Sequence, residues 1–152
     1  MLTGSTTTME RHDYADLVDL VITVNREVSV QVDLTGIVPL TATEVAVMRY
    51  VNDHDGCSAS KVAQSLSLHR SNVSPALKSL NLAGLIERRT LGRAVQLSAT
   101  AKARTNLRLI RERWNAVLSS ALADQPTDVA QTIKTLRTVE SALVRRRLEQ
   151  KS

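Results

Sequence analysis

Apolar residues recur at spacings of three and four along most of the chain, a pattern that predicts a mainly helical protein. A first helix is predicted over residues 9–33, although the end of that run, VSVQVDL, also alternates as a strand would. A second helix is predicted to begin at Thr41, because Thr41 and Glu44 have the spacing of a capping box. Ser58 is predicted to cap a short third helix. The pattern therefore places three helices in the first half of the chain and leads into a fourth.

The stretch RSNVSPALKSL, residues 70–80, predicts an amphipathic helix with a proline inside it. Proline lacks an N–H and costs about 3 kcal/mol in the middle of a helix. A start at Ser71 or Asn72 removes most of that cost, because the first amides of a helix have no partner within it. A start near His69 would lose one hydrogen bond. We therefore expect the later start, with Pro75 in the leading turn.

Two strand-like runs, LIERR and RAVQLSA, follow this helix and flank a TLG turn, which predicts a β-hairpin. Thr100 is then predicted to cap a long helix that runs to about Asp124, and Pro126 breaks it. The last helix is predicted to begin near Thr127. Its narrow apolar seam is typical of helix pairing and consists of Val129, Ile133, Leu136, Val139 and Leu143.

The second, third and fourth predicted helices are short, and together with the hairpin that follows them they make a winged helix-turn-helix. The predicted fold class is mainly α with a small β-hairpin wing. We expect a disordered tail over residues 1–8 and a single domain over 9–152. Within that domain the winged helix-turn-helix core covers about 38–99, and the helices at about 9–34 and 100–152 flank it.

Charge is distributed unevenly along the chain, whose formal net charge is +5. Residues 1–56 carry nine acidic and three basic side chains, whereas residues 69–104 carry seven basic side chains against Glu87 alone. The basic segment coincides with the helix and hairpin that a winged helix-turn-helix brings to DNA. Single-stranded nucleic acid is disfavoured, because the chain has no Phe and its few aromatic residues lie outside this segment.

A helical projection of residues 71–80 separates two faces. Val73, Ala76, Leu77 and Leu80 form the predicted core side. The opposite face is polar, with hydroxyl, amide and ammonium groups of the kind that contact bases and phosphates. Pro75 lies at its centre and could present its ring to a thymine methyl. The predicted DNA contacts are Arg70, Ser71, Asn72, Ser74, Pro75 and Lys78 from the helix, and Arg88, Arg89 and Arg93 from the hairpin.

The segments LTATEVAVMRYV, SASKVAQSLSLHRSNVSPALKSLNLAGLIERR and RAVQLSATAKAR follow one another in the order of a known family. Over roughly residues 38–104 the chain resembles the MarR (multiple antibiotic resistance regulator) family of bacterial winged-helix transcription factors. The resemblance implies a homodimer formed through the flanking helices, which binds a pseudo-palindromic duplex operator. It also implies a repressor that is released by a small phenolic or lipophilic effector.

The wing departs from the family pattern. The family usually has an Asp-x-Arg whose arginine enters the minor groove and whose aspartate orients it. By resemblance the arginine is Arg93, but Leu91 stands at the aspartate position and the tip is about three residues shorter. Minor-groove contact is therefore in question. This leaves an alternative function open, a winged-helix protein-interaction module without specific DNA binding.

Effector-binding residues are harder to assign than DNA contacts. Tyr14, Tyr50 and Trp114 could line an effector pocket, although aromatic residues on helices usually belong to a core. Cys57 follows a turn and is expected to be a small, partly buried side chain. Asp53, His54, Asp55 and Cys57 lie close together in sequence, but neighbours in a turn seldom point at one centre, so we expect no metal.

Other classes of function find no support in the sequence. There is no Gly-rich phosphate loop, nucleophile elbow or framed pair of carboxylates, so we expect neither an enzyme nor a cofactor. No apolar run approaches the roughly 18 residues of a membrane span, and the first residues do not have the pattern of a signal peptide. The expected location is the cytoplasm.

Overall fold

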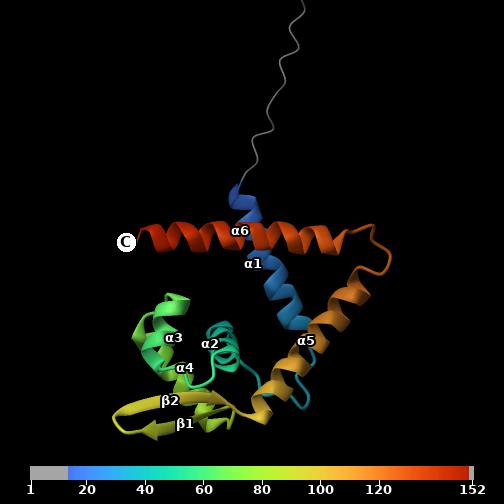
Figure 1. Ribbon diagram of the computed structural model, residues 1–152. Helices are drawn as coiled ribbons and strands as arrows, with labels where there is room; N and C mark the ends of the chain where they lie inside the picture. The colour runs from blue at the N-terminus through green and yellow to red at the C-terminus, as the bar shows by residue number, and fades with distance from the viewer. Residues whose placement is uncertain (1–13, 151–152) are drawn as a thin grey trace, which may run out of the picture. The chain divides into compact units, whose positions relative to one another are not determined.

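The computed structural model describes residues 14–150, and within that range it contains six helices and one β-hairpin (Figure 1). Contacts divide the chain into two compact units after Val117, and each unit is described by itself. The predicted tail over residues 1–8 and the predicted helix start at Met9 lie outside the described residues. The elements are α1 (Tyr14–Gln31), α2 (Ala42–Asp53), α3 (Ala59–Leu66), α4 (Arg70–Leu82), β1 (Ile86–Leu91), β2 (Ala94–Ala99), α5 (Ala101–Ala121) and α6 (Val129–Glu149).

The hydrophobic core of the first unit lies among α2, α3, α4 and the base of the hairpin (Figure 1). Val47, Met48 and Val51 of α2 are fully buried. The projected core side of α4 is confirmed, since its four apolar residues are at most 6% exposed. The core members are Val47, Met48, Val51, Val62, Ala63, Val73, Ala76, Leu77, Leu80, Leu85, Ile86, Leu97, Ala103 and Leu107.

Side-chain caps define the starts of α2 and α3, as the sequence predicts. Thr41 Oγ1 accepts from the amide of Glu44 at 3.2 Å, and Glu44 Oε2 accepts from the amide of Thr41 at 2.8 Å. This reciprocal pair satisfies two amides that the helix itself leaves unbonded. Ser58 Oγ likewise accepts from the amide of Lys61 at 3.2 Å. Local sequence therefore suffices to start both helices.

The predicted late start of α4 is wrong. The helix begins at Arg70 after the N-cap His69, whose carbonyl accepts from the amides of Asn72 and Val73 at 2.9 and 3.2 Å. The cause lies in the preceding turn, because α3 already ends at Ser67 in the left-handed conformation with φ 53°. Only two residues then separate the left-handed cap from the new helix.

Pro75 is consequently the sixth residue of α4, beyond its leading turn. The N–H that proline lacks would have bonded to the carbonyl of Ser71, four residues earlier. One hydrogen bond of the helix is therefore missing on its exposed side. The other end of α4 closes in a Schellman motif, because the amides of Gly84 and Leu85 donate to the carbonyls of Asn81 and Leu80 at 3.0 and 2.9 Å.

The hairpin is an antiparallel pair in which Ile86 lies opposite Ala99 and Leu91 lies opposite Ala94. The predicted TLG turn is wrong, since Thr90 and Leu91 belong to β1 and the turn is Gly92-Arg93. Gly92 has φ 61°, and a glycine at the first central position is typical of a two-residue type II′ hairpin turn. The wing thus extends by its own strands up to a minimal tip.

The loop before α3 adds a short third pairing to the wing. Gly56 donates its amide to the carbonyl of Leu97 at 2.9 Å, and Leu97 donates to the carbonyl of Cys57 at 2.9 Å. These bonds form an isolated antiparallel bridge on the edge of β2 that β1 does not use. The base of the wing is thereby fastened to the loop between α2 and α3.

The first helix, α1, ends at Gln31, so VSVQ (residues 28–31) is helical as predicted, whereas residues 32–34 are in neither a helix nor a strand and the predicted end near residue 33 is two residues late. The long helix α5 follows Thr100, whose Oγ1 accepts from the amide of Ala103 at 3.1 Å, as predicted. It ends at Ala121, three residues before the predicted end at Asp124, because turn bonds replace helical ones before Pro126.

Burial along α5 is confined mainly to its first half. Leu107 and Ile110 are buried, Trp114 is half-buried, and Leu118 is 40% exposed. Asn106 is buried among them, although an amide side chain does not fit the apolar pattern. Its side chain accepts from the amide of Val38 at 2.8 Å and donates to the carbonyl of Val38 at 3.1 Å, which satisfies both of its polar atoms.

The second unit consists of the end of α5 and the helix α6. The predicted start near Thr127 is two residues early, because α6 begins at Val129 after the cap Asp128, whose Oδ1 accepts from the amide of Gln131 at 2.9 Å. Within α6 no residue is buried, and Ile133 and Leu143 are 47% and 63% exposed. An amphipathic helix of this length with an uncovered seam is typical of helix pairing.

Candidate nucleic-acid interface

The outer face of α4 is a solvent-exposed polar surface. All of its predicted contact residues are exposed, while the opposite side of the same helix packs into the core. We call this surface the α4 outer face and define it as Ser71, Asn72, Ser74, Pro75 and Lys78. Because the helix is held from behind by buried apolar contacts, the outer face is presented on a rigid support. Its hydroxyl, amide and ammonium groups can donate to phosphates and to base edges.

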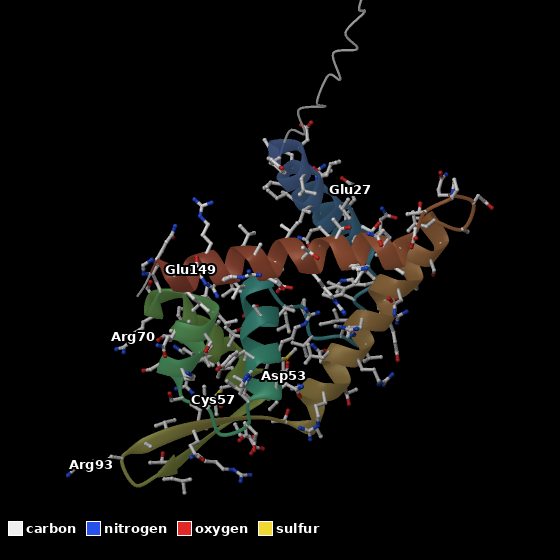
Figure 2. All side chains as sticks on the ribbon, turned by 45° about the horizontal axis from the view of Figure 1, so that its top comes forward. Glu27, Asp53, Cys57, Arg70, Arg93 and Glu149 are labelled. Carbon is white, nitrogen blue, oxygen red and sulfur yellow. The ribbon has the colours of Figure 1, made fainter. Side chains whose placement is uncertain are left out.

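Arg70 lies at the first position of α4 and reaches toward α3 (Figure 2). Its Nη2 is 3.5 Å from Ser60 Oγ, and both residues are exposed. The guanidinium therefore lies beside Ser60 of α3 at the surface, where it retains further donors for an anion. This position is compatible with the contact predicted from the sequence.

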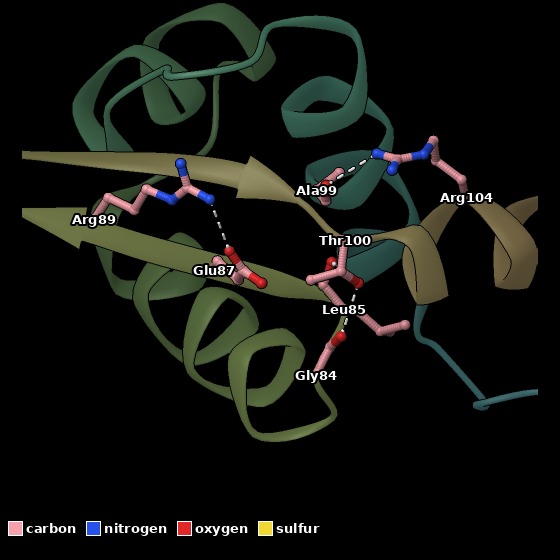
Figure 3. Close-up of polar contacts among 7 residues, drawn as sticks. All are labelled: Gly84, Leu85, Glu87, Arg89, Ala99, Thr100 and Arg104. Atoms are coloured by element: carbon pink, nitrogen blue, oxygen red, sulfur yellow. Dashed lines mark hydrogen bonds and ion pairs between the residues drawn. The ribbon is translucent and has the colours of Figure 1, made fainter.

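The three hairpin arginines do not form one cluster. Successive residues of a strand point to opposite faces, so Arg88 and Arg89 cannot both face the same surface. Arg89 lies 3.5 Å from Glu87 as an exposed ion pair (Figure 3). Arg93 lies at the tip of the wing, away from the helices (Figure 2). Leu91, at the position of the family's aspartate, is 60% exposed.

Two basic residues of the segment 69–104 donate hydrogen bonds to the protein's own backbone. Lys102 Nζ donates to the carbonyl of Ala83 at 2.6 Å, and Arg104 Nη1 donates to the carbonyl of Ala99 at 3.1 Å (Figure 3 shows the latter). Counting charges along the sequence cannot reveal this, because both acceptors are backbone carbonyls. Both side chains are exposed, and each commits one donor to the protein's own backbone.

A groove of about 510 Å³ lies between α2 and α5. At its side, the guanidinium of Arg49 lies 5.4 Å from the centre of the Trp114 ring, a cation–π contact. Arg108 pairs with Glu112 at 2.6 Å, whereas Arg111 makes no ion pair within residues 14–150. We call this the α2–α5 groove, lined by Arg49, Asn52, Asp53, Leu107, Arg108, Arg111, Glu112 and Asn115.

The aromatic residues predicted to line an effector pocket are not brought together. Tyr14 is 77% exposed on α1. Tyr50 accepts a hydrogen bond from Ser65 Oγ at 2.9 Å and stacks on His54 with ring centres 4.1 Å apart. Only Trp114 lies beside the groove, through its contact with Arg49. The polar lining was missed because it alternates with apolar positions on amphipathic helices and has the pattern of a solvated face.

Cys57 is half-buried, in agreement with the expected small, partly buried side chain. Burial raises the pKa of its thiol, and the nearby carboxylate of Asp55 raises it further against the lowering effect of a backbone hydrogen bond. Over residues 14–150 there is no group of three or more His, Cys, Asp or Glu side chains that could hold a metal ion. Nor does any helix in this range have the length and apolar character needed to cross a membrane.

The helices α2, α3 and α4 and the hairpin form a winged helix-turn-helix, in which α4 has a polar outer face and the two-stranded wing is basic. Residues 40–92 match the MarR family. This match confirms the resemblance to the MarR family over that segment, and the solved structures below share the winged-helix fold. A search of curated protein sequences gave no match.

Similar solved structures share the fold over most of the chain. A crystal structure of MarR is 20% identical, with a TM-score of 0.70, and covers 92% of this chain and 97% of its own. A MarR family protein from Bacillus stearothermophilus is 15% identical, with a TM-score of 0.64 and coverage of 86% and 94%. FabT of Streptococcus pneumoniae, solved in complex with DNA, is 21% identical, with a TM-score of 0.61 and coverage of 86% and 97%.

Proposed function

We propose that this protein is a dimeric, sequence-specific DNA-binding transcriptional regulator that acts as a repressor. The observation that carries this proposal is the α4 outer face, which is polar, exposed and backed by a fully buried apolar side. A rigid helix with such a face fits the major groove of duplex DNA, and the wing then lies beside the phosphate backbone. The similar FabT structure, solved with DNA, supports the same role for this fold.

The proposed homodimer is supported by apolar side chains that nothing in either unit covers. In α1, Val18, Leu20 and Ile22 are 57%, 62% and 61% exposed, and the seam of α6 is open as described above. Such apolar surface is typical of a protein–protein interface. A two-fold dimer would present two copies of α4 to the two halves of a pseudo-palindromic site.

Binding to the DNA upstream of the protein's own gene tests this proposal. We expect an electrophoretic shift of that fragment at nanomolar protein, with competition by the unlabelled fragment but not by a scrambled one. The apparent affinity should fall steeply between about 50 and 200 mM salt, because phosphate contacts release counterions. A reporter gene behind the fragment should be expressed less when the protein is present. No shift of any fragment at low salt would exclude the proposal.

The rival function is a winged-helix protein-interaction module, which the exposed Leu91 in the wing favours. The charge reversals Lys78→Glu and Arg93→Glu separate the two functions, because both side chains lie on the proposed DNA-facing elements. If the protein is a regulator, either change should remove most of its DNA affinity. If it is a protein-interaction module, neither change should alter its DNA affinity. Arg26→Glu on α1, whose side chain is 71% exposed, is the control for the change in net charge. Sedimentation verifies that this variant remains a dimer, because α1 is proposed to form part of the interface.

For ligand response, we propose the α2–α5 groove as the effector site. Its polar lining differs from the lipophilic pocket implied by the family resemblance, because guanidinium groups come from both helices. An effector with a carboxylate can pair with Arg111, and an aromatic ring can reach Trp114. Benzoate should therefore change the fluorescence of Trp114, the chain's one tryptophan, whereas neutral benzamide should not. Arg111→Gln should abolish the benzoate response, and equal responses to both compounds would contradict the assignment.

A further inference from the structure

The C-terminal end of α4 is bonded directly to the first turn of α5. The Schellman motif satisfies the carbonyls of Leu80 and Asn81, but it leaves those of Ala83 and Gly84 without a partner from α4. Both receive one at the start of α5: Lys102 Nζ donates to the carbonyl of Ala83 at 2.6 Å, and Oγ1 of Thr100, the residue that precedes α5, donates to the carbonyl of Gly84 at 2.8 Å (Figure 3 shows the latter). We call this contact the α4–α5 junction.

The chemistry of the junction suits a helix terminus. The carbonyl end of a helix carries a partial negative charge, so an ammonium group placed there is favoured. The stem of Lys102 lies against the backbone of Gly84, where an added Cβ would be 4.0 Å from both Cδ and Nζ of the lysine. Gly84 itself has φ 70°, which the left-handed end of α4 requires.

The α4–α5 junction connects residues on either side of the wing in sequence without involving the wing itself. Along the chain, α4 and α5 are separated by the whole hairpin. A backbone bond nevertheless joins their ends, because Thr100 donates its amide to the carbonyl of Leu85 at 3.0 Å. Ala103, one residue after Lys102, is fully buried in the core that α4 shares. The first turn of α5 therefore fixes the end of α4 through charge, hydroxyl and packing together.

We propose that Lys102 is a positioning residue for DNA recognition: it sets the orientation of α4 from α5 and does not itself contact a phosphate. This inference rests on the proposed DNA-binding function, since it assigns a role in presenting the α4 outer face. In sequence Lys102 belongs to the basic segment, although it is not among the predicted DNA contacts. Its ammonium is instead directed at the protein's own backbone.

Three variants of the full-length chain test the assignment. Lys102→Met keeps the aliphatic stem and removes the ammonium, Lys102→Arg restores a donor, and Lys78→Met removes an ammonium from the α4 outer face. Each is titrated over a salt series with a duplex that the wild-type protein selects from a random library, and with a scrambled duplex. Circular dichroism and thermal unfolding verify that each variant is folded.

We expect Lys102→Met to bind the selected duplex about fivefold to tenfold more weakly, with unchanged binding to the scrambled duplex and an unchanged salt slope. Lys102→Arg should restore affinity. Lys78→Met should weaken binding to both duplexes and reduce the salt slope by about 0.9 for each phosphate contact removed. A salt slope for Lys102→Met that falls as it does for Lys78→Met, or wild-type affinity for the selected duplex, would overturn the proposal.

Hydrogen exchange without DNA separates this inference from the proposed function. If Lys102 fixes the end of α4, the amides of Gly84 and Leu85 should exchange several-fold faster in Lys102→Met than in wild type, while those of α2 stay unchanged. Unchanged protection at both amides would overturn the positioning role even if the protein binds DNA. Faster exchange in a protein that selects no duplex would refute only the proposed function.

Discussion

Asn106 is a buried amide whose partner is a backbone 68 residues away. Replacing it with Leu keeps the volume but leaves the amide and carbonyl of Val38 without partners. An unsatisfied buried polar group costs about 1–3 kcal/mol, so we expect Asn106→Leu to lower the free energy of unfolding by about 2–4 kcal/mol. Urea denaturation measures this change. A variant as stable as wild type would show that water satisfies Val38 instead.

Pro75 lowers the stability of α4 but contributes its ring to the α4 outer face. Because it is the sixth residue of α4, its missing N–H is an interior one. Pro75→Ala should restore a helical hydrogen bond against a gain in unfolded-chain entropy, a net stabilisation of about 1–2 kcal/mol. Site preference should change at the same time, since the ring lies on the α4 outer face. The combination is measured by denaturation together with selection from a random duplex library.

The contrast between these two residues shows what the sequence could predict. The face of Pro75 follows from helical periodicity, which needs only neighbouring residues. The start of α4 does not, because it depends on how α3 ends at Ser67 in a left-handed conformation that no nearby glycine announces. The burial of Asn106 is equally inaccessible, since its partner is distant in sequence.

At the scale of elements, the capping box of α2 couples helix stability to pH. A hydrogen bond from the Ser79 side chain, opposed by partial burial and aided by the bonds with Thr41, holds the pKa of Glu44 below its usual value of 4.5. A lowered carboxyl pKa stabilises the fold above the unfolded-state pKa, and that stability is lost as the pH falls through the folded-state pKa. Acid should therefore weaken the start of α2 and its link to α4.

Glu44→Gln tests this coupling. It should destabilise the protein by about 1 kcal/mol at pH 7, as other losses of capping interactions do, and the difference from wild type should shrink below pH 4.5. Denaturation series at pH 7 and pH 3.5 measure both values. A constant difference across this range would show that the charge of Glu44 has no part in the stabilisation. Glu112→Gln, whose carboxylate lies in an exposed pair within α5, is the control.

The elements themselves were largely predictable, and their boundaries less so. Caps at Thr41, Ser58 and Thr100 are local signals, and all three start helices. The two strand-like runs predict the hairpin, but they do not fix the exact position of its turn. Strand pairing extends the ladder to Leu91 instead, so Gly92 alone supplies the left-handed turn residue.

At the scale of the whole molecule, the open seam of α6 predicts the oligomeric state. Leu136→Ser combined with Leu143→Ser removes two apolar side chains seven residues apart, each worth about 1.5–3 kcal/mol when buried. The dissociation constant of the dimer should rise by at least about 100-fold, which sedimentation measures. Lys134→Ser on the same helix should leave the dimer intact. A double variant that stays dimeric would place the interface elsewhere.

The distribution of basic residues along the sequence predicts a polyanionic partner, but it does not predict where those residues lie on the folded surface. The excess of basic residues over 69–104 pointed to a polyanion, yet Lys102 and Arg104 bond to backbone carbonyls. Arg88 and Arg89 lie on opposite faces of β1 by the alternation of a strand. Helical periodicity therefore predicts the outer face of α4 well. Which basic side chains also bond to the protein's own backbone depends on tertiary contacts, which the sequence does not reveal.

The bridge between Cys57 and Leu97 has a consequence for solubility. It occupies the outer edge of β2 at the base of the wing, so β1 is the hairpin's open edge. An open strand edge invites pairing with other chains, and charged side chains are the usual protection against it. Arg88 and Arg89 stand on that edge, so they guard against aggregation whether or not DNA is present. Alanine replacements made there to test DNA contacts should be checked for loss of monodispersity, and glutamine is the safer substitution.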